Sequence, residues 1–417
     1  MRPQAMLTPG RSVGRGSVHR RSFMQGAVAL DALAASRSLW PLKETQPMTV
    51  QAQTLPADEA LGALEPVVQF DGPMPTGVTV SHQGRIFVNF PKWGDDVTFT
   101  VAEIRNGRPV AYPDEATNRT VDNDPAAALV SVQSVVVDPA DRLWILDTGS
   151  PLFQPPSYGG PKLVCVDLAT DQVVQKILFP PDVALPTSYV NDVRFDLRRG
   201  SAGMAFVTDS SDKGPNGIIV VDLASGESWR RLHDHPSTKP EGLETFVPVV
   251  EGRPFVQRQP DGTVKPAPAM GSDGIAIAAD GARLYYCPLG SRRLCSVATD
   301  ALLDQAQDSA AAASVQAEGD KGGAADGLES DAAGYVYATN YEHNAVLRRA
   351  PDDTWETVVH DPRLLWPDTL SLATDGYLYV TANQLHRQAR YHDGQDLRRK
   401  PYTLFRVRVD AQPVLLR

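Results

Sequence analysis

Cysteine is scarce in this sequence, with only three residues in a chain of 417. So few thiols cannot staple a chain of this length, and their odd number leaves at least one of them unpaired. Cys287 and Cys295 stand on either side of a predicted hairpin turn, so a disulfide between them is one interpretation. The interpretation that we favour is that these two and Cys165 are reduced, half-buried thiols.

Long hydrophobic runs are also missing. No apolar stretch reaches the ~18 residues that a membrane-spanning helix needs, so we expect no membrane insertion. Lys and Arg total 40 against 50 Asp and Glu, and outside the N-terminus the basic residues are not massed in one stretch. This balance argues against nucleic acid as a partner. The sequence carries no Ser-His-Asp spacing, phosphate loop or CxxC cluster, and nothing in it points to an organic cofactor.

The N-terminal segment resembles an export signal. Arg20 and Arg21 precede a short apolar stretch of small residues, which is the pattern of a twin-arginine signal, although Asp31 interrupts the stretch. A disordered basic leader is the alternative interpretation. We expect residues 1–36 to be the signal, residues 37–60 to be a linker, and the mature protein to be secreted or periplasmic.

Six segments of the chain share one pattern: a polar residue, a short alternating apolar run, a turn rich in Asp, Gly and Ala, and a second apolar run. Such alternation around such a turn predicts a β-hairpin. The intervals leave room for two further strands after each hairpin. Six units of four antiparallel strands predict an all-β fold, a six-bladed β-propeller over residues 61–417. The hairpins begin at Thr76, Gln133, Asn191, Asp273, Asp326 and Asp368.

Two segments interrupt the repeat. An alanine-rich stretch near 300–316 predicts a short helical insertion between blades four and five, and residues 234–270 form a long excursion in blade three. The strand near 402–410 is expected to pair with blade one and close the ring, which would hide two sheet edges. A β-sandwich with an accessory domain is the competing architecture, but it does not explain why a leading polar residue recurs six times.

The leading polar residues are expected to meet at one mouth of the central channel, because the first strand of each blade lines that channel. The second strands return to the same face and end in further polar residues, so two concentric polar sets should share the rim. We predict that both sets contact a ligand, through Thr76, Gln133, Asn191, Asp147, Asp209, Asn340 and Asn383. Aromatic walls around the ligand are expected from Phe153, Tyr189, Tyr341 and Trp366.

The acidic members of the first set belong to the last three blades. Converging carboxylates raise one another's pKa values, and a bound cation removes the repulsion. Oxygen ligands suit Ca²⁺ best, with Mg²⁺, Mn²⁺ or Zn²⁺ as alternatives. The predicted metal ligands are Asn191, Asp273, Asp326 and Asp368. The competing interpretation is that each polar residue caps a strand or bonds to nearby backbone.

Several phrases of the sequence, among them LVSVQSVVVDPADRLWILDTG and DPRLLWPDTLSLATDGYLYVTANQLHR, resemble the major royal jelly protein/Yellow family in its bacterial branch, from about residue 65 to 410. The resemblance implies a six-bladed propeller, which the repeat count reaches independently. It leaves the function open, because one fold hosts many activities. Yellow-type members include dopachrome-converting tautomerases and binders of small amines, whereas royal jelly members serve as nutrient and structural proteins.

A more distant similarity is to the gluconolactonase/regucalcin propellers, in which a Glu, two Asn and an Asp hold a divalent cation or contact the lactone. By that similarity Asn191 matches the substrate-contacting Asn, Asp273 an Asn ligand and Asp326 the Asp ligand. Thr76 stands where the ligating Glu would be, and Asp368 is the residue that can replace its charge.

Two functions are consistent with this mouth. The one that we favour is binding of a small molecule, such as a cationic amine, in an acidic funnel with aromatic walls. The alternative is a lactone hydrolase or tautomerase, in which a cation polarises a carbonyl and Asp326, Asp368 or His386 moves a proton. A structural or storage role without a ligand is the third possibility, and the oligomeric state is left open.

Overall fold

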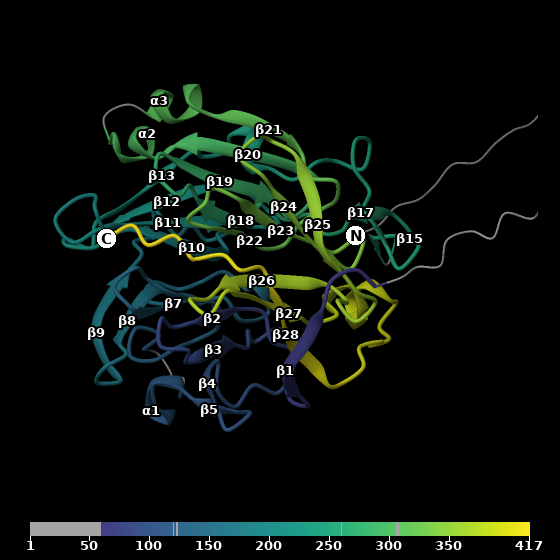
Figure 1. The fold of residues 1–417 in the computed structure, drawn as a ribbon, viewed down its shortest axis with the longest axis horizontal. Helices are drawn as coiled ribbons and strands as arrows, with labels where there is room; N and C mark the ends of the chain where they lie inside the picture. The colour runs from purple at the N-terminus through teal and green to yellow at the C-terminus, as the bar shows by residue number, and fades with distance from the viewer. Residues whose placement is uncertain (1–59, 120, 122–123, 260, 306–307) are drawn as a thin grey trace, which may run out of the picture. The chain divides into compact units, whose positions relative to one another are not determined.

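The computed structural model describes residues 60–119, 121, 124–259, 261–305 and 308–417. Within them the chain forms six four-stranded antiparallel sheets, the blades of a β-propeller (Figure 1). This confirms the predicted fold class. The predicted export signal, residues 1–36, lies outside the described residues, as does the predicted linker up to residue 59. No helix in the described part of the chain is long and apolar enough to cross a membrane.

Each blade is built from the channel outward. Blade one comprises β2 (Val78–Val80), β3 (Ile86–Asn89), β4 (Val101–Arg105) and β5 (Arg108–Ala111). Blade two comprises β6 (Val132–Val137), β7 (Arg142–Thr148), β8 (Pro161–Asp167) and β9 (Gln172–Leu178). Blade three comprises β10 (Val190–Asp196), β11 (Met204–Asp209), β12 (Gly217–Asp222) and β13 (Ser228–Arg231). Blade four comprises β18 (Ser272–Ile277), β19 (Arg283–Pro288), β20 (Arg293–Ala298) and β21 (Gln316–Asp320). Blade five comprises β22 (Leu328–Ser330), β23 (Val336–Asn340), β24 (Ala345–Arg349) and β25 (Trp355–His360). Blade six comprises β26 (Pro367–Leu372), β27 (Tyr377–Ala382), β28 (Tyr402–Arg408) and β1 (Leu64–Phe70).

The ring closes inside blade six. Strand β28 pairs with β27 on one side and with the N-terminal strand β1 on the other, in a register that places Phe70 opposite Tyr402. In Figure 1 the purple β1 lies beside the yellow β28. The expectation that the strand near 402–410 would pair with blade one is therefore wrong. Both ends of the propeller share one sheet, so backbone hydrogen bonds hold the circle shut.

The turn between the first and second strands has the same form in five blades. In each, a backbone N–H donates to the carbonyl three residues earlier, at 2.8–3.1 Å. The donating residue has a positive φ, between 59° and 91°, which favours glycine because it lacks a Cβ. Glycine fills this position in four of the five turns, at Gly84, Gly281, Gly334 and Gly376, and Asp141 fills it in blade two.

Buried apolar side chains fill the wedge between every pair of neighbouring blades. Between blades two and three, Trp144 stacks on Phe195 with ring centroids 5.3 Å apart. Between blades six and one, Val68 and Phe70 of β1 pack with Val88. Because both faces of each sheet are covered, the strands read as nearly continuous apolar runs instead of strict alternation.

The first strands of four blades begin with a β-bulge. Their pairing with the second strand shifts register between Val132 and Ser134, Val190 and Val193, Ser272 and Ile275, and Pro367 and Leu370. An extra residue in one strand bends the backbone locally and re-aims a side chain. In each case the bulge contains the predicted polar residue, at Gln133, Asn191, Asp273 or Asp368.

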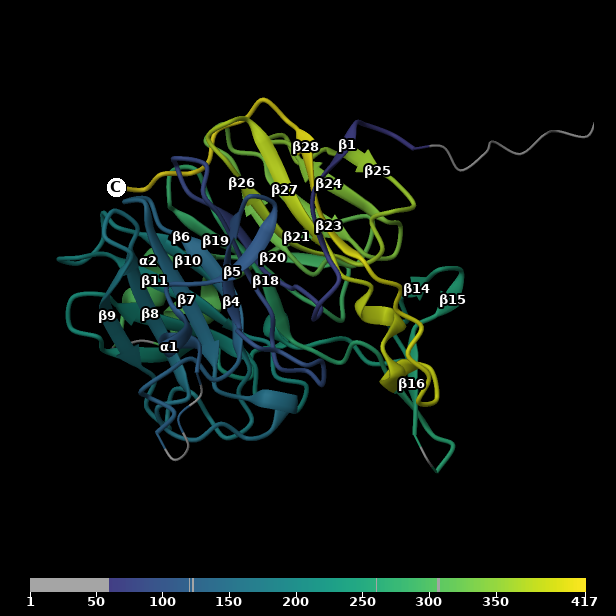
Figure 2. The ribbon, with the colours of Figure 1, turned by 90° about the horizontal axis from the view of Figure 1, so that it is seen from below.

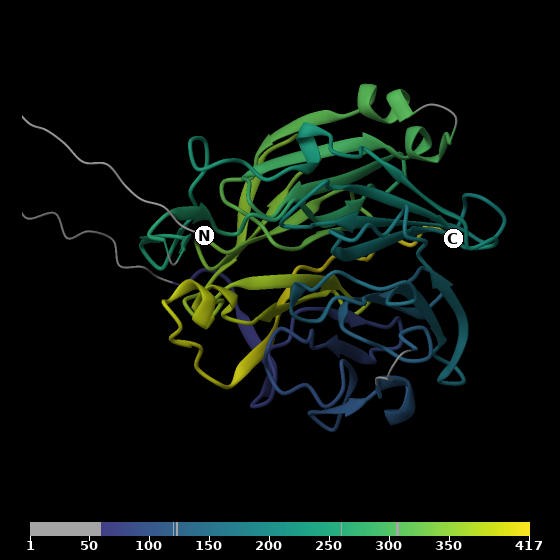
Figure 3. The same cartoon turned by 180° about the vertical axis from the view of Figure 1, so that it is seen from behind.

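The helical insertion is present at the predicted residues, but it lies within a blade and not between two blades. Helices α2 (Thr299–Leu303) and α3 (Asp308–Ala313) connect β20 to β21 within blade four, at its outer edge (green at the top of Figure 3). The prediction that they lie between blades four and five is wrong, because residues 316–320 form the outer strand of blade four. The excursion of blade three carries two hairpins, β14 (Val249–Val250) with β15 (Arg253–Pro254) and β16 (Val256–Arg258) with β17 (Val264–Pro266).

The three cysteines are free and fully buried, not half-buried. Cys295 packs with Tyr286 on the side of blade four that faces blade three, whereas Cys287 belongs to the cluster between blades four and five. The two thiols therefore lie on opposite faces of one sheet. This geometry rules out the disulfide interpretation.

Residues 412–417 cross the end of the channel that lies opposite the first-strand starts. The Ala332 N–H, in the turn of blade five, donates to the Gln412 carbonyl at 2.9 Å. The Leu197 N–H, in the turn of blade three, donates to the Leu416 carbonyl at 2.8 Å. Arg417 reaches the Pro139 carbonyl in the turn of blade two, which is opposite blade five in the ring. In Figure 1 the segment is the yellow stretch of chain that ends at the C label.

Substituting Phe70 by alanine tests the closure. The ring is 2% exposed and meets Phe90 edge-on at a centroid distance of 5.7 Å, so its loss leaves a cavity in the wedge beside β1. We expect the free energy of unfolding to fall by about 3–5 kcal/mol, measured by urea denaturation. The control is Gln69→Ala, an exposed side chain on the same strand, which should change it by less than about 0.5 kcal/mol. Equal effects of the two substitutions would contradict a closing role for β1.

Candidate functional site

A small pocket opens at the mouth where the first strands begin. Five of the six predicted leading residues line it, namely Gln133, Asn191, Asp273, Asp326 and Asp368. The free space among them is small, about that of one water molecule. The remaining wall consists of Trp93, Tyr189, Pro268, Met270, Leu289, Leu385, Arg390 and Tyr391.

The three aspartates of this pocket are buried, with 4–7% of each residue exposed. Asp326 accepts a hydrogen bond from the indole N–H of Trp366 at 2.7 Å, and a second from the carboxyl group of Asp273. Asp368 accepts bonds from the Asn383 amide at 2.6 Å and from the Thr369 hydroxyl at 3.0 Å. The group is therefore acidic and partly hydrogen-bonded, with no basic partner bound to any of its members among the described residues.

Burial and mutual repulsion keep these carboxyl groups protonated at unusually high pH. Burial raises the pKa of Asp273 well above its ordinary value, and the charges of Asp326 and Asp368 raise it further. Burial and then the charge of Asp326 raise the pKa of Asp368 in the same way. Burial raises the pKa of Asp326 to about 6, and its two hydrogen bonds oppose a larger rise. The cluster therefore holds its protons to a higher pH than ordinary aspartates do, and a bound cation would favour their release.

The opposite side of the pocket is aromatic. The Trp93 N–H donates to the Tyr189 hydroxyl at 2.7 Å, and that hydroxyl donates to the Gln133 side-chain oxygen at 3.0 Å. Phe153 stacks on both rings, at centroid distances of 5.3 Å and 4.8 Å. The amide nitrogen of Asn191 donates to the Ser210 hydroxyl at 3.0 Å, which leaves its oxygen for the pocket.

Of the four aromatic residues predicted as walls, Tyr189 lines the pocket directly. Phe153 lies behind it, in the stack just described. Trp366 and Tyr341 stack face to face at 4.1 Å behind Asp326, and Trp366 touches that carboxylate through its N–H. These rings thus fix the acidic side chain more than they line the space.

Arg390 is a functional candidate that the sequence pattern did not reveal. It is the one basic side chain in the wall of the mouth pocket, and its guanidinium lies over the rings of Phe153 at 5.1 Å and Tyr391 at 4.7 Å. It belongs to the irregular connection between β27 and β28, outside the repeat. The available signal was compositional: contrary to the even spread of basic residues described above, that connection concentrates Arg387, Arg390, Arg398, Arg399 and Lys400.

The predicted second polar set has local hydrogen-bond partners and does not line the pocket. Asp147 binds the buried Lys162 amine at 2.7 Å, and Asp209 binds Arg230 at 2.8 Å. Asn340 accepts from the His343 N–H at 3.2 Å, while Asn383 bonds to Asp368. Thr76, the sixth leading residue, accepts a hydrogen bond from Asn89 at 2.8 Å instead of reaching the pocket.

His386 lies next to the aspartates but not among them. Its ring stacks on the face of Trp366 with a centroid distance of 5.8 Å, whereas Asp326 accepts from the N–H at the edge of the same indole. Its Nε2 atom is 2.8 Å from a carboxylate oxygen of Glu251. Burial lowers the pKa of His386, although Glu251 opposes that shift. The imidazole faces a neighbouring cleft instead of the mouth.

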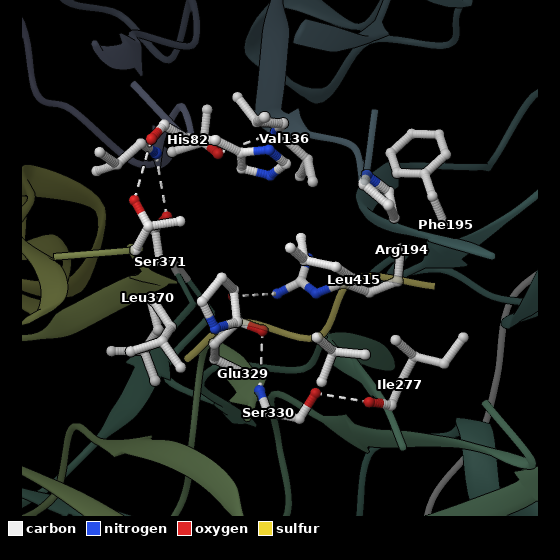
Figure 4. Close-up of a pocket in the computed structure, with 18 of the residues that line it drawn as sticks. His82, Val136, Arg194, Phe195, Ile277, Glu329, Ser330, Leu370, Ser371 and Leu415 are labelled. Carbon is white, nitrogen blue, oxygen red and sulfur yellow. Dashed lines mark hydrogen bonds and ion pairs between the residues drawn. The ribbon is translucent and has the colours of Figure 1, made fainter. Parts of the chain in front are cut away.

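A second layer of charge lies deeper in the channel. Asp192 accepts from the Ser134 hydroxyl at 2.7 Å and from Arg194 at 2.9 Å. Arg194 donates to the Leu328 carbonyl of blade five at 2.7 Å and lies 3.8 Å from Glu329. Figure 4 shows Arg194 and Glu329 pointing toward each other across the chamber at the far end of the channel, with Leu415 passing beside them. This network links blades three and five below the mouth.

The polar side chains at the mouth offer oxygen atoms as possible ligands for the predicted cation. Carboxylate and amide oxygens are ligands that Ca²⁺ and Mg²⁺ prefer. Among the described residues, however, no three His, Cys, Asp or Glu side chains lie close enough together to hold a metal ion. Among the described residues, Asn191, Asp273, Asp326 and Asp368 therefore offer the oxygen ligands that a hard cation prefers, without the spacing that would hold one.

The fold and the pocket define the class of this protein, a six-bladed β-propeller with a buried acidic pocket at one channel mouth. The chain belongs to the major royal jelly protein family, whose sequence profile matches residues 130–413. The Yellow protein of Drosophila subobscura is 29% identical over 248 residues, covering 55% of this chain and 40% of that protein. The Drosophila melanogaster Yellow protein is 28% identical over 265 residues, covering 60% and 45%. The chain matches less than half the length of these relatives.

Solved structures of other propellers share the fold. Regucalcin from Agrobacterium tumefaciens, described as a calcium-binding protein, superposes with a TM-score of 0.53 at 15% identity, covering 85% of this chain and 98% of its own. A luciferin-regenerating enzyme gives a TM-score of 0.52 at 10% identity, covering 85% and 99%. At these identities the likeness establishes the architecture, in agreement with the distant similarity seen in the sequence.

The raised pKa of Asp326 predicts how stability depends on pH. Its pKa is about 6 in the folded chain and about 3.9 in an unfolded one. The unfolded chain therefore loses this proton first, and stability falls as the pH rises from about 4 to about 7. The loss from this group is on the order of 3 kcal/mol. Urea denaturation across this range should show a shallower decline in Asp326→Asn than in the unsubstituted protein.

The control for this measurement is Asp182→Asn, an exposed carboxylate in the connection between blades two and three. It should leave the decline unchanged, because the substitution lies on an exposed side chain outside the buried cluster. A stability that rises with pH over the same range in the unsubstituted protein would contradict protonation of the buried cluster.

Proposed function

We propose that this protein binds a small organic cation, such as a primary amine, at the mouth of its channel. The observation that carries the proposal is the buried group Asp273, Asp326 and Asp368, which faces one water-sized space. An ammonium group is about the size of the water that this space admits. It donates several hydrogen bonds and supplies the positive charge that relieves the repulsion among the carboxylates.

The aromatic side of the pocket supports an organic cation over a bare metal ion. Trp93, Tyr189 and Tyr391 stand in the wall opposite or above the aspartates, and aromatic faces attract a cation and cover its apolar body. A metal ion would use none of these surfaces. A divalent cation, with Ca²⁺ first, is the alternative occupant, held by Asn191, Asp273, Asp326 and Asp368.

Arg390 sets a limit on the ligand. Its guanidinium stands in the same wall and lies over Phe153 and Tyr391, so it repels a positive charge on the outer part of the ligand. A molecule with one ammonium head and a neutral body satisfies both ends of the pocket. Because Arg390 and Tyr391 belong to the connection between β27 and β28, the body of the ligand lies against that connection.

Titration with tyramine tests the proposal, with 4-ethylphenol as the matched ligand without the amine. We expect saturable 1:1 binding of tyramine alone in a calorimeter. Binding should release protons, seen as a heat that changes with the ionisation enthalpy of the buffer, because the cation displaces protons from Asp273 and Asp368. Asp273→Asn should weaken binding about ten- to hundredfold through loss of a charge-assisted hydrogen bond.

Two controls make the result decisive. Arg390→Gln should strengthen tyramine binding by roughly three- to tenfold, because it removes a like charge from the wall. Calcium chloride should bind more weakly than tyramine, and elemental analysis of the purified protein should find no stoichiometric metal. Equal binding of tyramine and 4-ethylphenol, or stoichiometric metal whose removal abolishes binding, would refute the amine in favour of an apolar ligand or a cation.

A second candidate function rests on the pKa of Asp326, about 6. A carboxyl group with this pKa exchanges its proton near neutral pH, which suits an acid–base catalyst for tautomerisation or lactone opening. On this hypothesis, turnover of dopachrome or gluconolactone rises with pH through an apparent pKa near 6, and Asp326→Asn removes it. Turnover that survives in Asp326→Asn would exclude this role.

We also propose that the protein acts outside the cytoplasm, in the periplasm or beyond. The support is the twin-arginine pattern at Arg20 and Arg21, followed by the short apolar stretch. The three buried thiols are compatible with that location, since each is held on a separate site in the blades and none is exposed to oxidation.

A further inference from the structure

A large cleft lies beside the mouth, between the excursion of blade three and the connection from β27 to β28. Its volume is about 770 Å³. Strand β16 packs against the short helix η4 (Ala389–Tyr391), which joins the two walls. Figure 2 shows β14, β15 and β16 next to the yellow connection of blade six, to one side of the propeller. We call this feature the arginine cleft, after Arg253, Arg258, Arg387, Arg398 and Arg399, which line it.

The arginine cleft has a surplus of positive charge in an acidic protein. Its five arginines face three carboxylates, those of Glu251, Asp393 and Asp396, while the whole chain carries a formal charge of −10. A local surplus of this sign draws anions from solution against the field of the rest of the molecule. The cleft is thus rich in positive charge, whereas the mouth pocket is rich in carboxyl groups.

Two of the arginines are already paired. Arg387 binds Glu251, with its Nε atom 2.9 Å from a carboxylate oxygen. Arg398 binds Asp396 and also Asp95, the latter at 2.8 Å. The Arg387–Glu251 pair joins the two walls, whereas Arg398 pairs within its own connection and with Asp95 of blade one, which leaves the remaining cations to face the cleft.

Three arginines lack a carboxylate partner among the described residues: Arg253, Arg258 and Arg399. The backbone of Arg399 is fixed from both sides, because its N–H donates to the Gln384 side-chain oxygen at 2.8 Å and its carbonyl accepts from the Gln384 amide at 2.6 Å. Arg253 and Arg258 project from the hairpins of the excursion. Cationic side chains thus reach one space from two anchored walls.

Aromatic rings form the floor of the cleft. Phe255 and Tyr391 lie at a centroid distance of 4.6 Å, and Phe255 meets Trp366 at 5.4 Å. Phe255 is almost fully buried, so the floor is a firm apolar surface under the arginines. A ligand therefore meets an apolar base and a rim of guanidinium groups.

We propose that the arginine cleft binds a small polyanion that carries two or more phosphate or sulfate groups. Guanidinium groups pair with tetrahedral oxyanions through two parallel hydrogen bonds, which Lys cannot do. Three unpaired arginines from two walls match more than one such group on the same molecule. This site is separate from the amine pocket and does not depend on the proposed function, although Tyr391 lines both.

Tripolyphosphate and sucrose octasulfate are the probes, the first for phosphate and the second for sulfate, with citrate as a carboxylate control. At low ionic strength we expect saturable 1:1 binding of at least one probe and much weaker binding of citrate. The double variant Arg253→Glu/Arg258→Glu should weaken the binding of that probe about ten- to hundredfold. The better of the two probes identifies the source of the anion.

The matched control is Arg108→Glu/Arg119→Glu, which makes the same change in net charge on exposed residues of blade one. It should leave binding unchanged within about twofold, because the two arginines are outside the cleft and exposed charges are screened. An equal loss in both double variants would show general attraction to the surface and overturn the proposal. So would the absence of saturable binding by either probe, or citrate binding as tightly as they do.

Discussion

The structure depends on covering both faces of every blade. A single four-stranded sheet leaves an apolar face open, and each one here is covered only because a neighbour stands on either side. That requirement cannot be met by an open row of blades, whose end sheets would each expose a face. The pairing of β1 with β28 removes the two ends. The mouth pocket draws one residue from each of several blades, so it has a defined shape only in the closed ring.

The closed ring also supports groups that would be costly elsewhere. Three carboxyl groups are buried at one mouth, and Asp192, Arg194 and Glu329 lie below them in the channel. Buried charge is tolerated when it is paired or protonated. The lower group is largely paired through Arg194, whereas the upper group keeps protons and a hydrogen bond from the Trp366 indole. Among the described residues, only the upper carboxyl groups therefore have no basic side chain bound to them.

Much of the fold and part of the site could be predicted from the sequence, because the repeat that defines the blades also carries the site residues. Gln133, Asn191, Asp273, Asp326 and Asp368 were found by their position before a first strand. Repeat position alone could not show that Asp147 has a partner, since Lys162 comes from the third strand. Nor could it show that His386 and Asp326 contact different parts of one indole.

Other features lie outside the repeat altogether. Strand β1 precedes the first hairpin, so its place in blade six follows from ring geometry and not from local pattern. Arg390 and the arginines of the cleft come from irregular segments that only the folded chain brings together. The helices within blade four are placed by the strand that follows them, residues 316–320, whose polar sequence gave little β signal.

The segment 412–417 affects how a molecule can pass through the channel. It spans the far end from the turn of blade five to the turns of blades two and three, and Arg194 bridges the bore above it. The segment and Arg194 therefore obstruct passage through the far end of the channel. On the proposed function, the ligand arrives and departs past Arg390 and Tyr391, which stand in the wall of the mouth pocket, so those two side chains would govern residence time as well as selection.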